Sequence, residues 1–137
     1  MKHSGGCLCG LVRYEFTPKG KHFDTCHCSM CRKWGGGPSF AVEADGDIQF
    51  SGEEHLSLYQ SSKWAERGFC KKCGTHLFYR LLNHPYCNFN LGTIDKSDEF
   101  QFTTQIFVDF KPDNYDFANK TKMMTEKDVM EAFGAES

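Results

Sequence analysis

Hydrophobic and polar residues alternate in short runs along most of this chain, and glycines and prolines are scattered between the runs. Residues 11–16 show the pattern most plainly, because Val12, Tyr14 and Phe16 fall on one face of an extended segment and charged residues fall on the other. A period of two residues is typical of a β-strand with one buried face. We therefore predict a strand in this segment.

Further strands are predicted where β-branched and aromatic residues gather between turn signals such as Asp45-Gly46 and Ser51-Gly52. The predicted strands cover residues 40–43, 48–50, 56–60, 65–69, 75–81, 86–91 and 105–110. Many short strands at regular spacing indicate a mainly β fold of short antiparallel strands.

Two segments depart from the strand pattern. Residues 35–38, three glycines followed by proline, argue against regular structure and leave backbone amides accessible. Residues 125–128 (Thr-Glu-Lys-Asp) resemble a capping box, and Val129, Met130 and Phe133 follow it. The C-terminal segment is therefore predicted to form a short helix.

The composition is that of one globular domain. The chain has 137 residues, of which 39% are hydrophobic and 25% are charged, and its net charge at pH 7 is −2. We predict a single domain over residues 1–137. The charge provides no field that attracts nucleic acid or an acidic membrane. Neither a signal peptide nor an apolar run of about eighteen residues is present, so we expect a cytoplasmic protein with no membrane partner.

The chain contains eight cysteines. In a reducing compartment they are expected to be metal ligands or reactive thiols in preference to disulfides. Seven of them form three groups, at positions 7 and 9, at positions 26, 28 and 31, and at positions 70 and 73. Because tetrahedral zinc takes four ligands, the seven divide into a group of four and a group of three.

The first and last groups together suggest a closed site. Residues 70–74 (Cys-Lys-Lys-Cys-Gly) have the form of a zinc knuckle, which needs a second pair of ligands. Cys7 and Cys9 can supply that pair, because residues two apart on an extended chain project on the same side. We predict that Cys7, Cys9, Cys70 and Cys73 hold a structural zinc.

Cys26, Cys28 and Cys31 supply three further ligands within six residues. A zinc with three protein ligands and one open position is typical of catalytic or substrate-binding sites. One alternative is that Cys87 closes this site as a fourth ligand, although it shares a strand face with apolar residues, as a core cysteine would. Another is that His27 is a ligand, although neighbours in an extended segment point in opposite directions.

The charge of such a site favours sulfur chemistry. Three thiolates place excess negative charge on the ion, so it activates water weakly and suits a soft incoming thiol better. Coordination deprotonates a thiol, and the thiolate is the nucleophile. The predicted chemistry is formation or breakage of a carbon–sulfur bond on a thiol cosubstrate. Arg32 and Lys33 would offset the charge of the site, hold a substrate carboxylate, or face solvent.

Three cysteine motifs stand in order along the chain: residues 5–10 (Gly-Gly-Cys-Leu-Cys-Gly), residues 26–33 (Cys-His-Cys-Ser-Met-Cys-Arg-Lys) and residues 67–74 (Arg-Gly-Phe-Cys-Lys-Lys-Cys-Gly). Together with Ser61-Ser62, residues 91–95, residues 106–108 and Lys111-Pro112, they resemble the family of glutathione-dependent formaldehyde-activating enzymes, which also includes the centromere protein V domain. The resemblance spans nearly the whole chain.

The resemblance implies an Mss4-like β-tent with two zinc ions per chain. It implies a structural zinc on Cys7, Cys9, Cys70 and Cys73 and a catalytic zinc on Cys26, Cys28 and Cys31. The activity of the family's namesake is condensation of formaldehyde with glutathione to S-(hydroxymethyl)glutathione, a carbon–sulfur lyase reaction in reverse. The family frequently has a histidine where this chain has Gln105, a departure that bears on the substrate and not on the zinc.

The first functional hypothesis is thus a zinc-dependent carbon–sulfur lyase acting on a thiol conjugate, with glutathione or a similar small thiol as partner. The second is a non-catalytic zinc-binding module that recognises a protein or nucleic acid. Lys71-Lys72 lacks the wider basic stripe that nucleic-acid binding would require. A redox pair of Cys26 and Cys28 is disfavoured, because cysteines two apart form a strained disulfide. The sequence leaves the oligomeric state open.

Three other residues are weighed between structure and function. Trp34 and Trp64 are predicted to lie in the core, the alternative being the wall of a pocket beside the open zinc. Arg67 is predicted to form a structural ion pair, the alternative being a contact with a substrate carboxylate.

Overall fold

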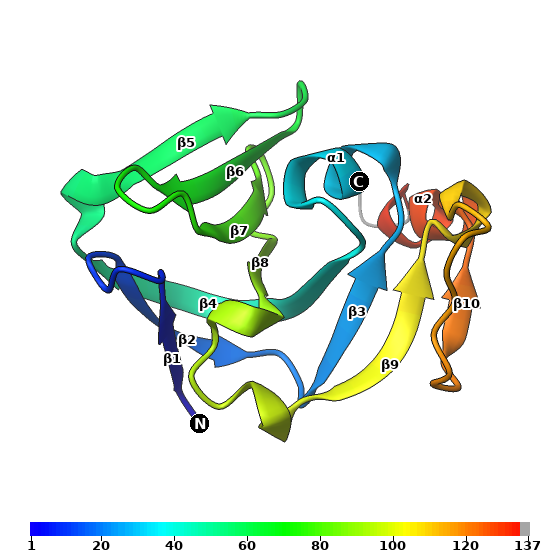
Figure 1. Ribbon diagram of the computed structural model, residues 1–137, viewed down its shortest axis with the longest axis horizontal. Coiled ribbons are helices and arrows are strands. Elements are labelled where there is room, and N and C mark those ends of the chain that lie inside the picture. Colours follow the sequence, from blue (N-terminus) through cyan, green and yellow to red (C-terminus); the bar gives the residue numbers. More distant parts are fainter. Residues whose placement is uncertain (135–137) are drawn as a thin grey trace.

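The computed structural model describes residues 1–134, which form a mainly β structure with two short helices (Figure 1). The strands are β1 (His3–Gly6), β2 (Arg13–Pro18), β3 (His22–Cys26), β4 (Ser39–Ser51), β5 (Leu56–Gln60), β6 (Ala65–Cys70), β7 (His76–Leu81), β8 (Cys87–Asn90), β9 (Gln101–Ile106) and β10 (Lys122–Met124). The helices are α1 (Ser29–Gly35) and α2 (Glu126–Gly134). Single 3-10 turns cover Glu53–His55, Leu91–Thr93, Ser97–Glu99 and Val108–Phe110. The predicted mainly β fold is confirmed.

The strands form one mixed sheet. Hydrogen-bonded neighbours follow the order β10-β9-β3-β4-β8-β7-β6-β5, and β2 joins β4 to β1. Most pairs are antiparallel, but β9 pairs in parallel with both β3 and β10. The prediction of a purely antiparallel sheet is therefore wrong at this edge. Parallel neighbours need a long connection, and the chain between β3 and β9 supplies it by forming strands of its own (Figure 1).

The strand β4 connects the two parts of the sheet. It runs for 13 residues, pairing with β3 and β8 near its start and with β2 further along. The predicted turn at Asp45-Gly46 is wrong, because these residues lie inside β4. Gly46 has a φ of +84°, and the register opposite it shifts between Phe16 and Pro18. Glycine accommodates this local bulge without breaking the strand.

Aromatic rings fill the core beneath β4. Tyr14 stacks on Phe89 with ring centroids 3.9 Å apart, and Phe16 lies 4.8 Å from the same ring. Cys87 is buried in this cluster, as expected of a core cysteine. Trp64 lies outside it and is 55% exposed, so its predicted core position is wrong.

Several boundaries differ from the sequence prediction. β9 covers Gln101–Ile106 and not residues 105–110, because Phe107 adopts a φ of +55° and a 3-10 turn follows it. β1, β3 and β10 were not predicted as strands. β1 contains two glycines and has little β propensity of its own, so its conformation depends on pairing with β2.

The predicted C-terminal helix is confirmed as α2. The backbone N–H of Asp128 donates to Thr125 Oγ1 at 3.2 Å, and the backbone N–H of Thr125 donates to Asp128 Oδ2 at 2.9 Å. This reciprocal pair is a capping box in which aspartate occupies N3, the third residue of the helix. Val129 is the buried residue of the helix. Within residues 1–134, neither helix has the length and apolar character that crossing a bilayer requires.

Candidate metal centres

The first candidate centre joins the N-terminal segment to the end of β6. The sulfurs of Cys7, Cys9, Cys70 and Cys73 all lie within 4.8 Å of one another. The sulfur of Cys9 lies 3.6 Å from that of Cys7 and 3.7 Å from that of Cys70. Tetrahedral zinc–sulfur bonds of about 2.3 Å place neighbouring sulfurs about 3.8 Å apart. The four sulfurs therefore fit a zinc ion.

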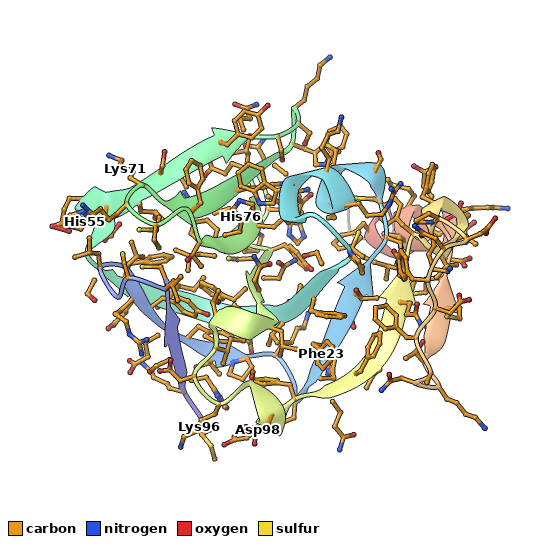
Figure 2. The ribbon with its side chains drawn as sticks, in the orientation of Figure 1. Phe23, His55, Lys71, His76, Lys96 and Asp98 are labelled. Carbon is orange, nitrogen blue, oxygen red and sulfur yellow. The ribbon has the colours of Figure 1, made fainter. Side chains whose placement is uncertain are left out.

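Backbone amides surround the same four sulfurs. Cys7 Sγ accepts a hydrogen bond from the N–H of Val12 at 3.3 Å. Cys70 Sγ accepts from the N–H groups of Lys72 and Cys73 at 3.3 and 3.5 Å. Gly74, with a φ of +77°, makes the tight turn after the knuckle. Such donors stabilise thiolates, which is the form that a metal requires. Lys71 lies at the outer end of β6 near His55 (Figure 2).

The second candidate centre lies where β3 meets α1. Cys26 ends β3, Cys28 caps α1, and Cys31 lies in the first turn of that helix. Their three sulfurs lie within 4.8 Å of one another, and all three residues are half-buried. The helix itself was not predicted. It forms because Cys28 Sγ accepts the N–H of Cys31 at 3.3 Å, as an N-cap side chain does.

Neither alternative ligand joins the three sulfurs. Cys87 belongs to the aromatic core instead, where burial raises the pKa of its thiol to about 12. His27 is fully buried, and its two ring nitrogens are engaged elsewhere: Nδ1 with the hydroxyl of Tyr115 at 2.7 Å and Nε2 with Gln105 Oε1 at 2.8 Å. Among the described residues, no fourth cysteine, histidine or carboxylate completes this group.

Gln105 determines how His27 is protonated. The amide Nε2 of Gln105 donates to Thr121 Oγ1 at 3.1 Å, so its oxygen faces His27 as an acceptor. We therefore assign the proton of His27 to Nε2, with Nδ1 accepting from Tyr115. Burial lowers the pKa of His27, which favours this neutral ring. Gln105 thus holds the side chain of His27, which lies between Cys26 and Cys28 in the sequence.

We predict that Gln105→Leu destabilises the protein by about 1–3 kcal/mol, because it leaves a buried N–H of His27 without an acceptor. Urea unfolding followed by circular dichroism measures this change. The matched control is Gln101→Leu, at the exposed start of the same strand, for which a change below about 0.5 kcal/mol is expected. Equal stability of the two variants would contradict the assigned role.

Arg67 approaches the second centre from β6. It is 4% exposed, and both of its Nη atoms lie 3.7 Å from Cys31 Sγ. Its Nε donates to Ser61 Oγ at 3.1 Å, and its guanidinium lies 4.9 Å from the ring centre of Tyr79. Among the described residues, the carboxylate partner expected of an ion pair is not found, and the guanidinium of Arg67 contacts a cysteine sulfur instead. Sequence spacing could not indicate this contact, because it depends on how α1 packs against β6.

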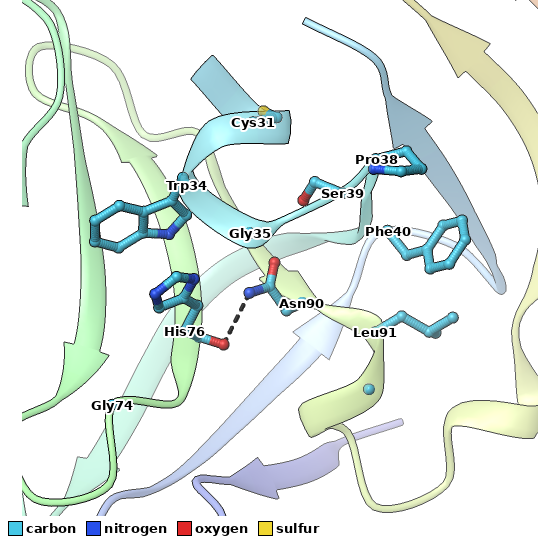
Figure 3. A pocket seen from close by; sticks show the side chains of 11 residues that line it. Cys31, Trp34, Gly35, Pro38, Ser39, Phe40, Gly74, His76, Asn90 and Leu91 are labelled. Carbon is cyan, nitrogen blue, oxygen red and sulfur yellow. Dashed lines mark hydrogen bonds between the residues drawn. The ribbon is translucent and has the colours of Figure 1, made fainter. Parts of the chain in front are cut away.

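A pocket of about 320 Å³ opens beside Cys31 (Figure 3). Trp34 forms one wall and stacks on His76 with ring centroids 4.1 Å apart, and His76 lies next to α1 in Figure 2. Asn90 fixes this part of β7 by donating to the His76 carbonyl at 2.8 Å. Phe40 lies across the pocket from Trp34. Trp34 therefore lines the pocket instead of filling the core.

A second pocket of about 490 Å³ is lined by Arg32 and Lys33 of α1. Arg32 is held by main-chain oxygens, with Nε donating to His27 at 2.9 Å and Nη2 to Phe110 at 3.3 Å. Lys33 is exposed. These two cations therefore face a cavity, and the hydrogen bonds of Arg32 go to the backbone and not to the cysteine sulfurs.

Other proteins are similar to this chain in sequence. The family model described as glutathione-dependent formaldehyde-activating enzyme matches residues 2–110. The chain belongs to this family. An uncharacterized lyase of Schizosaccharomyces pombe is 36% identical to this family member over 133 residues, which are 96% of each chain. A Halomonas elongata protein with the provisional name glutathione-dependent formaldehyde-activating enzyme is 35% identical over 98 residues, 61% of this chain and 62% of that one.

A solved structure has the same fold. The crystal structure of a Rhodobacter sphaeroides protein matches with a TM-score of 0.60 and 28% identity, covering 73% of this chain and 99% of that one. Family membership and the names of the relatives support an enzyme of the lyase kind with a link to glutathione. The family resemblance of the cysteine motifs is confirmed, whereas the Mss4-like arrangement stays a prediction.

Proposed function

We propose that this chain is a single-domain, zinc-dependent carbon–sulfur lyase that joins glutathione to formaldehyde, as an S-(hydroxymethyl)glutathione synthase does. The observation that carries the proposal is the group of Cys26, Cys28 and Cys31. The described residues bring three sulfurs together there without a fourth protein ligand, and Cys31 also lines a pocket. A site of this kind can accept a sulfur from solution.

The two centres have different roles in this proposal. Cys7, Cys9, Cys70 and Cys73 hold a structural zinc, and Cys26, Cys28 and Cys31 hold a catalytic zinc. When bound at the second centre, zinc lowers the pKa of a coordinated thiol, so that glutathione reacts as a thiolate at neutral pH. A reducing compartment such as the cytoplasm, which keeps all seven cysteines as thiols, is the location we propose.

The reaction needs no change in oxidation state overall. The glutathione thiol loses its proton, its sulfur forms a bond to the aldehyde carbon, and the carbonyl oxygen gains a proton as it becomes a hydroxyl. The chain's own residues position the reactants and exclude water. Trp34, Phe40 and Leu91 give the pocket beside Cys31 an apolar lining, and the stacked ring of His76 supports Trp34.

The zinc-loaded protein tests the proposal directly. We expect it to accelerate the exchange between free formaldehyde and S-(hydroxymethyl)glutathione, measured by NMR with carbon-13 formaldehyde. If the protein binds two zinc ions but does not accelerate the exchange above its spontaneous rate, the lyase proposal is wrong. A non-catalytic zinc module that recognises a protein or nucleic acid would then be the better hypothesis.

Glutathione carries two carboxylates, and we place one of them in the pocket of Arg32 and Lys33. Lys33→Met is expected to weaken glutathione binding about 2- to 5-fold, the size of one exposed charge contact. Isothermal titration calorimetry measures the change. The control ligand is 2-mercaptoethanol, which lacks a carboxylate and should bind both proteins equally. An equal loss for both thiols would show that Lys33 does not contact a carboxylate.

A further inference from the structure

Arg67 is a buried cation, and no carboxylate among the described residues neutralises it. A buried guanidinium is strongly unfavourable unless it is paired. Within residues 1–134, no carboxylate lies within ion-pair distance of Arg67. The glutamate next to it in the chain, Glu66, pairs with Arg80 at 2.6 Å. Tyr79, beneath the guanidinium, stays neutral because burial raises the pKa of its phenol. The group that remains in contact with the guanidinium is the sulfur of Cys31, which would be an anionic thiolate as a ligand of a metal ion.

Arg67 is held in this position from three sides. Its two Nη atoms are equally distant from Cys31 Sγ, at 3.7 Å, and Ser61 and Tyr79 fix the Nε and the flat face of the guanidinium. An arginine fork can make these contacts together, whereas a lysine ammonium is a single point charge. The side chain is therefore oriented toward the three sulfurs and is not a flexible surface cation.

Counting charges shows what this cation does. A divalent ion with three thiolates has a net charge of −1, and a fourth thiolate from solution would make the net charge −2. When the positive charge of Arg67 is included, the net charge of the site is 0 before the fourth thiolate binds and −1 afterwards. We propose that Arg67 is a positioning residue whose charge allows the three-sulfur centre to accept an anionic sulfur ligand. This inference rests on the proposed function and adds a residue to it.

The test compares an anionic ligand with a neutral one. Cobalt replaces zinc in the full chain, and absorption bands of cobalt report binding of 2-mercaptoethanol, which coordinates as a thiolate, and of imidazole, which is neutral. Arg67→Gln is expected to weaken 2-mercaptoethanol binding roughly 10- to 100-fold, the effect of a unit charge a few ångströms away. Imidazole binding should change less than about 3-fold, because no charge is added.

Two further variants separate charge from geometry. Ser61→Ala removes the Nε partner but keeps the cation, so the preference for thiol over imidazole should stay within about 3-fold of wild type. Arg67→Lys also keeps a charge and should retain most of the preference, even if the glutamine variant fails to hold cobalt. A lysine variant with no preference left would overturn the inference.

Other outcomes would overturn it in distinguishable ways. Equal weakening of both ligands in Arg67→Gln would mean that Arg67 only holds the site together. Weaker binding of glutathione with unchanged 2-mercaptoethanol would make Arg67 a carboxylate receptor. If wild-type protein with cobalt at the three-sulfur centre binds no thiol, the proposed function fails, and the inference falls with it.

Discussion

Cys28→Ser is expected to lower the zinc content from two ions to one and to abolish catalysed condensation of glutathione with formaldehyde. A serine oxygen replaces one of three thiolate ligands, so the second centre no longer retains its metal. The rate should fall at least about 100-fold, since metal activation contributes several kcal/mol. The fold should persist, because serine can cap α1 through its hydroxyl as Cys28 does through its sulfur.

Metal analysis, the NMR exchange assay and thermal unfolding together measure this result. Cys87→Ala is the matched control, a cysteine removed from the core and not from a candidate centre. It should keep both ions and the full rate while losing some stability to a small cavity. A Cys28→Ser protein with two zinc ions and an unchanged rate would contradict the catalytic assignment.

Cys73→Ser is expected to unfold the protein, and any activity would be lost as a consequence of unfolding. The four-sulfur centre ties the segment at Cys7 and Cys9 to the knuckle after β6, more than sixty residues away in the chain. Binding of a structural zinc contributes about 10–16 kcal/mol in small domains, which equals or exceeds the whole stability of many proteins. We expect the variant to lose cooperative thermal unfolding and to lose zinc from both centres.

The control for this variant is Thr75→Ala, next to the same centre. Thr75 Oγ1 accepts the N–H of Leu8 at 3.0 Å and lies 3.1 Å from Cys73 Sγ, but it is not a ligand. Its loss should cost about 0.5–1.5 kcal/mol and leave both ions bound. Should Cys73→Ser unfold as cooperatively, and at the same temperature, as the threonine variant, the four-sulfur centre would not be structural.

The sequence predicted which cysteines meet, because ligand number and spacing constrain a metal site more tightly than they constrain a strand. Cys7 and Cys9 could be matched with Cys70 and Cys73 by counting to four, although β1 beside them was not predicted. Short alternating runs such as residues 56–60 also gave correct strands. The strands needed only local information, and the matching of the cysteine groups needed only their number and spacing.

What the sequence could not predict depends on contacts between distant segments. The parallel pairing of β3 with β9 requires knowledge of the whole chain between them. The helix α1 is capped by a cysteine, a residue that is not among the usual N-caps. The contact of Arg67 with Cys31 joins residues 36 positions apart and needs the packing of α1 on β6.

Among residues 1–134, Cys31 alone both belongs to a cysteine group and lines the pocket beside it. The rest of that wall, including Trp34, Phe40 and Leu91, comes from residues that take no part in holding an ion. Under the proposed function, substitutions in this wall would change which thiol conjugates are accepted without altering any residue that holds the ion.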